Sequence, residues 1–186
     1  MEQEGAMDAQ WEEMDSRPGY EDSDTEGLRQ ALVDASKLWL AHDGLWFLEW
    51  EREHGMDAAM AADAAAWRRF AAIEATRIMS RLGLEPGGGV DALAQCLRHR
   101  LYANMCRFAI QRRGGCELRL RMLDCRVQDA RERQAKPPFP CKCVGIVEFD
   151  AFARTVDPRF TTTCEQCPPD ELSHGGWCEW RFGLAE

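Results

Sequence analysis

Apolar residues recur at helical spacing through the first half of the chain and at alternating positions only in the second half. Residues 28–54 and 56–82 repeat apolar positions three and four residues apart, which predicts two long helices. We expect Gly55 to separate them and Gly83 to end the second, because glycine readily takes the left-handed conformation that follows a helix. Gly44 interrupts the first pattern, which resumes one residue later.

The first helix is predicted to begin with a capping box formed by Ser23 and Glu26. A third helix, after the glycine-rich residues 86–89, carries apolar residues on one face from 90 to 105. Beyond residue 106 the pattern fits either more helix or the start of an extended segment.

The second half of the chain mixes strand and helix signals. Apolar residues alternate with charged ones at 116–122, which predicts a half-buried strand. Two more strands are expected at 160–164 and 177–184, and helices at 127–134 and 143–156. The predicted fold class is therefore α+β, with N-terminal helices followed by a small antiparallel sheet with a crossover helix.

Charge is concentrated at the N-terminus. The net charge is −9, and residues 1–26 account for it, with ten acidic residues against Arg17 alone. Residues 1–22 have too little apolar content to offset the entropy of ordering, so we expect a disordered acidic tail. Residues 23–186 are expected to form a single α+β domain with a cysteine-rich, metal-binding C-terminal part at about 139–186. The balanced charge of residues 27–186, with 22 acidic and 22 basic residues, argues against DNA or RNA as partners, which require cationic side chains in excess.

The sequence offers no signal for export or for a membrane. No apolar run reaches the roughly 18 residues needed to span a bilayer, and the acidic N-terminus lacks the features of a signal peptide. We therefore expect a cytoplasmic protein without membrane contacts. Nine cysteines are present, and an odd count without an export signal favours reduced thiols or metal ligands over disulfides. The sequence leaves open whether two copies form a homodimer.

Five of the nine cysteines lie in the last forty-six residues, and the first ninety-five residues hold none. Cys164 and Cys167 end a predicted strand at Cys-x-x-Cys spacing, and a hairpin would return Cys178 to the same end of the sheet. With Cys141 they form a four-cysteine set that suits zinc, although iron or an iron–sulfur cluster uses the same ligands. Buried apolar cysteines are the alternative interpretation, and thiol redox chemistry by Cys164 and Cys167 is another. Two further residues are kept as substitute ligands: Cys143 and His174.

The C-terminal part resembles the 4-vinyl reductase domain in its runs Cys141–Gly145, Cys164-x-x-Cys167 and Cys178–Phe182. Members of that family act in bacteriochlorophyll biosynthesis or as zinc-containing sensors of small aromatic molecules in transcription regulators. The sensors bind zinc with three Cys and one Glu. Carried over to this chain, these ligands fall on Cys141, Cys164, Cys167 and Cys178, with Cys164 in place of the Glu. The resemblance therefore implies a zinc-containing, sensor-like domain.

A longer resemblance covers nearly the whole of the predicted domain. It rests on the segments Lys37–Phe47, Cys125–Arg131, Phe139–Cys141, Asp157–Arg159 and Cys178–Trp180. These look like an uncharacterised family of small prokaryotic cytosolic proteins, which is itself similar to amino-thiazoline-carboxylate hydrolase-like proteins. Because its members have no agreed activity, this resemblance supports the fold more than the function.

Cys125 stands apart from the cysteines of the predicted hairpin. Arg126 follows it, and a nearby guanidinium lowers the pKa of a thiol. A hydrolase-like enzyme would use Cys125 as its nucleophile, assisted by Arg126, Glu49 or His42. The alternative is a buried cysteine at the end of a strand, next to solvated arginines.

Aromatic side chains gather near the middle of the first predicted helix. Such clusters usually belong to a core, but this one can also line a pocket for an apolar or aromatic small molecule. The leading hypothesis is a metal-stabilised small-molecule-binding domain, in which the metal site holds the C-terminal hairpin over a pocket lined by the helices. The residues expected to contact the ligand are Trp39, His42, Trp46, Phe47, Glu49 and Trp50.

Overall fold

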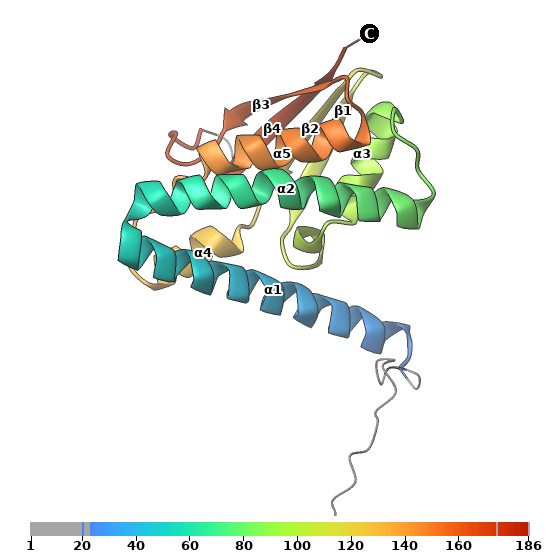
Figure 1. The fold of residues 1–186 in the computed structure, drawn as a ribbon. Coiled ribbons are helices and arrows are strands. Elements are labelled where there is room, and N and C mark those ends of the chain that lie inside the picture. Colours follow the sequence, from blue (N-terminus) through green and yellow to red (C-terminus); the bar gives the residue numbers. More distant parts are fainter. Residues whose placement is uncertain (1–19, 21–22, 174, 186) are drawn as a thin grey trace, which may run out of the picture.

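The computed structural model describes Tyr20, residues 23–173 and residues 175–185, and it confirms the α+β class (Figure 1). Helices dominate the N-terminal part, and a small antiparallel sheet follows. The elements are α1 (Thr25–His54), α2 (Met56–Leu82), α3 (Gly89–Arg98), a short 3-10 helix η1 (Leu101–Asn104), β1 (Phe108–Arg113), β2 (Glu117–Met122), α4 (Arg126–Arg133), α5 (Lys142–Val156), β3 (Phe160–Gln166) and β4 (Cys178–Leu184).

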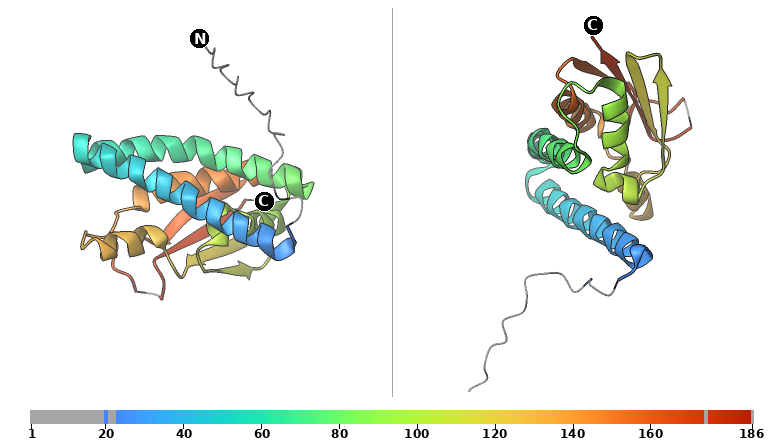
Figure 2. Two further views of the ribbon diagram at one scale, coloured as in Figure 1. Left: turned by 90° about the horizontal axis from the view of Figure 1, so that it is seen from below. Right: turned by 90° about the vertical axis from the view of Figure 1, so that its right-hand side faces the viewer.

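The two long helices form an antiparallel hairpin, with α1 on the side away from the sheet (Figure 2). Gly55 joins them at φ 83°, and Gly83 ends α2 at φ 66°, as the sequence predicts. Gly44, which interrupts the apolar pattern, does not interrupt the helix, because α1 runs through it. A single glycine costs a helix only about 1 kcal/mol, which packing of a long helix readily offsets.

The first turn of α1 differs from the predicted capping box. Asp24, one residue beyond Ser23, is the N-cap, and its carboxylate accepts a hydrogen bond of 2.7 Å from the backbone N–H of Gly27. Aspartate and serine side chains accept a hydrogen bond from a free backbone N–H in the first helical turn about equally well. The position of the first helical turn therefore decides which of the two caps it.

The third helix is shorter than its apolar pattern predicts. α3 ends at Arg98, and Arg100 takes an extended conformation before η1 begins. The carboxylate of Glu74, on α2, accepts hydrogen bonds from Nε of Arg100 and from the backbone N–H of Leu101. Because the Leu101 amide bonds to Glu74, it does not continue the α3 ladder, and the chain leaves the helix here.

The sheet has the strand order β1-β2-β4-β3, with every neighbouring pair antiparallel. Leu118 pairs with Phe182, Leu120 with Trp180, and Met122 with Cys178. Side chains opposite each other in such a ladder share one face, so these rows form the apolar face of the sheet. β1 (Phe108–Arg113) lies in the segment beyond residue 106, where the sequence pattern fitted either helix or an extended segment.

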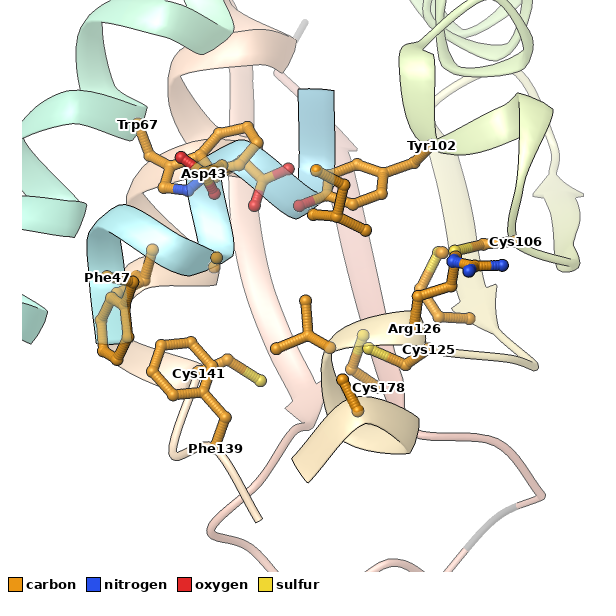
Figure 3. A pocket seen from close by; sticks show the side chains of 18 of the residues that line it. Asp43, Phe47, Trp67, Tyr102, Cys106, Cys125, Arg126, Phe139, Cys141 and Cys178 are labelled. Atoms are coloured by element: carbon orange, nitrogen blue, oxygen red, sulfur yellow. The ribbon is translucent and has the colours of Figure 1, made fainter. Parts of the chain in front are cut away.

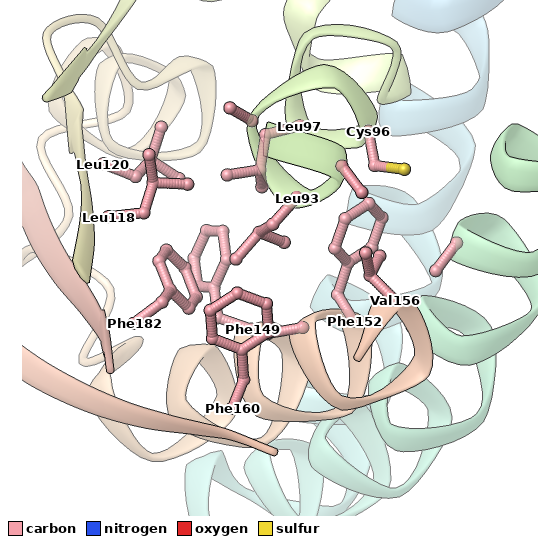
Figure 4. Packing of buried hydrophobic residues seen from close by; sticks show 14 of the residues in the cluster. Leu93, Cys96, Leu97, Leu118, Leu120, Phe149, Phe152, Val156, Phe160 and Phe182 are labelled. Atoms are coloured by element: carbon pink, nitrogen blue, oxygen red, sulfur yellow. The ribbon is translucent and has the colours of Figure 1, made fainter. Parts of the chain in front are cut away.

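α5 lies between this apolar face and α2 (Figure 1). It contributes Phe149, Phe152 and Val156 to the main core, where they meet Leu93 of α3 and Phe182 of β4 (Figure 4). The α5 residues recur at helical spacing and are nearly inaccessible to solvent. The core thus fixes α5 across the sheet and places the first turn of α5 near the start of β4.

The predicted disordered tail, residues 1–22, lies outside the described residues except for Tyr20. Within the described part of the chain, no helix combines the length and apolar character needed to cross a membrane.

Candidate functional site

A cavity of about 470 Å³ lies between α1, the η1 turn, α4, the first turns of α5 and one end of the sheet (Figure 3). Its volume is within the range of small-molecule sites, roughly 300–1,000 Å³. Its lining is mostly apolar, and its polar part includes a group of carboxylates, a group of cysteines and five basic side chains, Lys37, Arg100, Arg126, Arg131 and Arg133. Asp43 and Phe47 reach it from α1, Trp67 from α2 and Tyr102 from η1.

Aromatic rings form much of the wall. The rings of Trp67 and Tyr102 stack at 5.9 Å between centroids, and Trp39 packs edge-on against both from behind. Phe47 meets Phe139 edge-on at 4.9 Å. These contacts hold the rings in defined orientations, so the wall is largely preformed.

Three carboxylates converge on the same cavity from three helices: Asp43 on α1, Asp63 on α2 and Glu148 on α5. The pKa of Asp63 is raised to about 7, first by burial and then by the negative charges of Asp43 and Glu148. Burial also raises the pKa of Asp43 and of Glu148. Asp63 is therefore only partly ionised near neutral pH.

Arg100 is the buried cation beside this group. Its Nη2 lies 2.7 Å from Glu148 Oε1 and 2.8 Å from Glu74 Oε2, and its guanidinium packs 4.6 Å from the centroid of Phe152. Although burial acts to lower the pKa of Arg100, Glu148 and Glu74 raise it, so the cation is committed to these two carboxylates. Among the described residues, neither Asp43 nor Asp63 forms an ion pair with a basic side chain.

The second polar group consists of sulfur. Cys125, Cys141, Cys167 and Cys178 all line the cavity, although they come from four different segments (Figure 3 labels three of them). The sulfurs of Cys141 and Cys167 are 3.4 Å apart. This contact lowers the pKa of Cys141 and, together with contact to Cys178 and burial, raises that of Cys167.

Backbone hydrogen bonds bring these segments together. The turn after β3 closes through the N–H of Asp170, which donates to the carbonyl of Cys167 at 2.9 Å. The N–H of Lys142 donates to the carbonyl of Pro168 at 3.0 Å and docks that turn on the start of α5, where Cys141 is the N-cap. At the other side, Trp177 N–H donates to Met122 and fixes Cys178 beside the end of β2.

Gln128, on α4, holds the segment before α5 in place. Its amide donates to the carbonyl of Phe139 at 2.9 Å and accepts from the N–H of Phe139 at 2.9 Å. The same Nε2 lies 3.5 Å from the sulfur of Cys141. This buried side chain therefore positions one of the four cysteines.

The metal ligands predicted from the sequence were Cys141, Cys164, Cys167 and Cys178. The cavity is lined by Cys125 in place of Cys164, together with the other three. Cys164 lies within β3, opposite Trp180, and does not line the cavity. Cys143 is exposed, and His174 lies outside the described residues. Across the described part of the chain, no set of three or more His, Cys, Asp or Glu side chains is arranged, as it stands, to hold a metal ion.

Cys125 lines the cavity in surroundings that disfavour a thiolate. Burial raises its pKa to about 12, despite backbone hydrogen bonds from Gln128 and Val127. Of its suggested helpers, Arg126 lines the cavity, whereas Glu49 and His42 are exposed on α1 and do not. The sulfur of Cys167 contacts that of Cys141. The redox pair predicted from the sequence was instead Cys164 and Cys167.

Of the six side chains expected to contact a ligand, only Phe47 lines the cavity. Trp46 and Trp50 are 64% and 43% exposed, and Trp46 Nε1 donates to His42 on the outer face of α1. Positions four residues apart share a helix face, so 42, 46 and 50 point outward together while 43 and 47 point inward. Trp39 supports the wall without lining it.

The sequence pattern did not single out the three lining acids, which lie within predicted helices. Glu148 falls on the apolar stripe of α5, between the buried residues Val144 and Phe152, and Asp63 stands in an alanine-rich run. An acid on an apolar stripe is a usable signal for a buried site. No local sequence pattern distinguishes Asp43 from an exposed helical residue.

The chain belongs to a family of unknown function, DUF6125, whose model matches residues 22–184. No curated protein and no solved structure matches the chain. Membership in an uncharacterised family was expected, and the comparisons give no relationship to the 4-vinyl reductase domain or to the hydrolase-like proteins.

Proposed function

We propose that this protein is a small-molecule-binding domain whose ligand occupies the 470 Å³ cavity and has an apolar or aromatic body that carries one amino group. The observation that carries this proposal is the cavity itself, in which aromatic walls surround Asp43 and Asp63, two carboxylates that form no salt bridge among the described residues.

The walls favour an apolar or aromatic body. Trp67, Tyr102, Phe47 and Phe139 offer ring faces and edges, and burial of apolar ligand surface contributes roughly 25 cal/mol per Å². The resemblance of the C-terminal part to a family with sensors of small aromatic molecules supports the same class of ligand.

The carboxylates favour a cationic group on that body. Burial, and after it the negative charges of Asp43 and Glu148, raise the pKa of Asp63 to about 7. An ammonium group placed there would relieve this repulsion and would also lie near the faces of Trp67 and Tyr102, which attract cations. Binding of an amine should therefore stabilise the ionised form of Asp63.

The proposal is tested by a thermal-shift screen with matched pairs of ligands, arylalkylamines against the corresponding alcohols. Amines should raise the melting temperature more than their alcohols, and the difference should grow between pH 6 and pH 8, as Asp63 ionises. Asp63→Asn should remove the preference for amines, whereas Asp57→Asn, at an exposed position on the same helix, should retain it. Equal shifts for amines and alcohols would refute the cationic part, and no shift from any apolar ligand would refute the binding function.

A further inference from the structure

Four cysteines that are far apart in the sequence meet at one end of the cavity. Cys125 is the N-cap of α4, Cys141 is the N-cap of α5, Cys167 follows β3, and Cys178 begins β4. All four side chains line the same cavity. In Figure 3 the sulfur of Cys141 points toward those of Cys125 and Cys178.

We propose that Cys125, Cys141, Cys167 and Cys178 together bind one thiophilic metal ion, with zinc as the expected ion. This ligand set differs from the one that the sequence suggests, since Cys125 takes the place of Cys164. The site is separate from the amine-binding carboxylates, so it does not depend on the proposed ligand.

The spacing of the sulfurs fits a metal site better than a disulfide. A tetrahedral site with Zn–S bonds of about 2.3 Å places its sulfurs about 3.8 Å apart, whereas a disulfide requires about 2.05 Å. Cys141 and Cys167 lie at 3.4 Å, so a metal requires their separation to grow by only a few tenths of an ångström. As they stand, the described side chains form no group that could hold a metal ion, so binding requires the sulfurs of Cys125 and Cys178 to move toward the Cys141–Cys167 pair.

Contacts around Cys141 prepare it to act as a thiolate ligand. It caps the N-terminus of a helix of 15 residues, where the partial positive charge of the backbone favours an anion. The amide of Gln128 lies 3.5 Å from its sulfur and is fixed by two hydrogen bonds to Phe139. Donors of this kind orient metal ligands and tune their basicity.

The fold also explains why Cys164 does not join this set. It lies within the β3 ladder, paired with Trp180, and the register is irregular between Cys164 and Gln166. Cys167 follows that irregularity and is held by the turn that docks on α5. Cys167 therefore lines the cavity, whereas Cys164 packs against the main core beside Trp180 and does not line it.

Four thiolates leave no open coordination position, so the metal would have a structural role. Binding replaces four S–H protons and ties together α4, α5, β4 and the turn after β3. Metal-binding free energy then adds to folding free energy. Removal of the ion should loosen one end of the cavity while the main core, built on α2, α3, α5 and the sheet, remains.

The test uses the full chain, purified under reducing conditions without added metal. Elemental analysis should find one equivalent of zinc, and replacement with Co²⁺ should give the visible spectrum of a tetrahedral four-thiolate site. Ser variants at 125, 141, 167 and 178 should each weaken Co²⁺ binding by at least about tenfold. The matched controls Cys164→Ser and Cys143→Ser should bind as the wild type does.

A second readout does not depend on variants that fold poorly. In the metal-loaded wild type, iodoacetamide should label Cys143 quickly and leave Cys125, Cys141, Cys167 and Cys178 unlabelled until a chelator is added. A wild type that neither contains metal nor takes up Zn²⁺ or Co²⁺ would overturn the proposal, as would equal metal loss from Cys164→Ser and Cys125→Ser. Iron in place of zinc would uphold the ligand set and overturn the choice of ion. Thermal shifts by amines are measured separately on the metal-loaded protein, so an absent amine shift would refute the proposed ligand and leave the metal result standing.

Discussion

The ring of Trp180 lies directly against the backbone of Gly145, so closely that a methyl group at position 145 would come within 2.6 Å of ring atom Cζ2. This contact joins the second turn of α5 to β4 and sets how near the helix lies to the sheet. Both residues also line the cavity. The absence of a side chain at Gly145 thus determines the distance between two walls of the site.

Gly145→Ala should destabilise the protein, because a methyl group 2.6 Å from the buried Trp180 ring would force the ring or α5 to move. Overpacking of a dense core typically costs about 1–3 kcal/mol. Equilibrium urea denaturation measures the change in free energy of unfolding. An unchanged midpoint would mean that the ring and helix separate easily.

Gly44→Ala is the matched control and should have the opposite sign. Gly44 lies inside α1, and a methyl group there would meet nothing within 4 Å. Alanine should stabilise the helix by about 0.5–1 kcal/mol, since it loses less backbone entropy on folding. The same denaturation experiment checks this. A loss of stability would show that the Gly44 backbone needs the freedom of glycine.

The stability of the protein should fall as the pH rises through the region set by Asp63. Its pKa is about 7 in the folded protein and 3.8 in a model carboxyl group, so the folded state holds a proton that the unfolded state releases. The resulting penalty is absent below pH 4, grows between about pH 4 and pH 7, and is complete above that range. Asp63→Asn should therefore stabilise the protein more at pH 8 than at pH 4. The exposed variant Asp57→Asn should show no such trend in thermal unfolding at the two pH values.

Arg100→Leu should be among the most destabilising substitutions in the chain. It would leave Glu74 and Glu148 buried without their cation, and breaking a buried ion pair in this way costs about 3–5 kcal/mol. Arg112→Leu removes an exposed ion pair with Asp91 and should cost less than about 1 kcal/mol. Comparable losses of unfolding free energy in the two variants would contradict the assignment of Arg100 as the buried structural cation.

The two neighbouring aromatic residues of α1 should respond differently to a ligand. Phe47 lines the cavity, whereas Trp46 is exposed. A ligand at 100 times its dissociation constant should stabilise the wild type by about 2.7 kcal/mol. Phe47→Ala should greatly reduce this thermal shift, and Trp46→Ala should retain it. Retention in Phe47→Ala with loss in Trp46→Ala would move the binding site to the outer face of α1.

Local sequence patterns are enough to predict the fold class and most of the helices and strands. Helical spacing marked α1, α2 and α5, glycines at 55 and 83 marked the ends of the long helices, and alternation marked β2. These features are local, because periodicity and terminal residues depend on the geometry of a single element. The sequence also showed that cysteines concentrate near the C-terminus.

Which side chains lie close together depends on the tertiary structure. Periodicity does not reveal that Asp43, Asp63 and Glu148 converge from three helices, nor that the sulfur beside Cys167 is that of Cys141. Periodicity also does not reveal which face of α1 points inward, so it does not predict that Phe47 lines the cavity and Trp46 does not. These outcomes depend on how the apolar face of the sheet packs on α5 and on hydrogen bonds between residues far apart in the chain, which no local pattern contains.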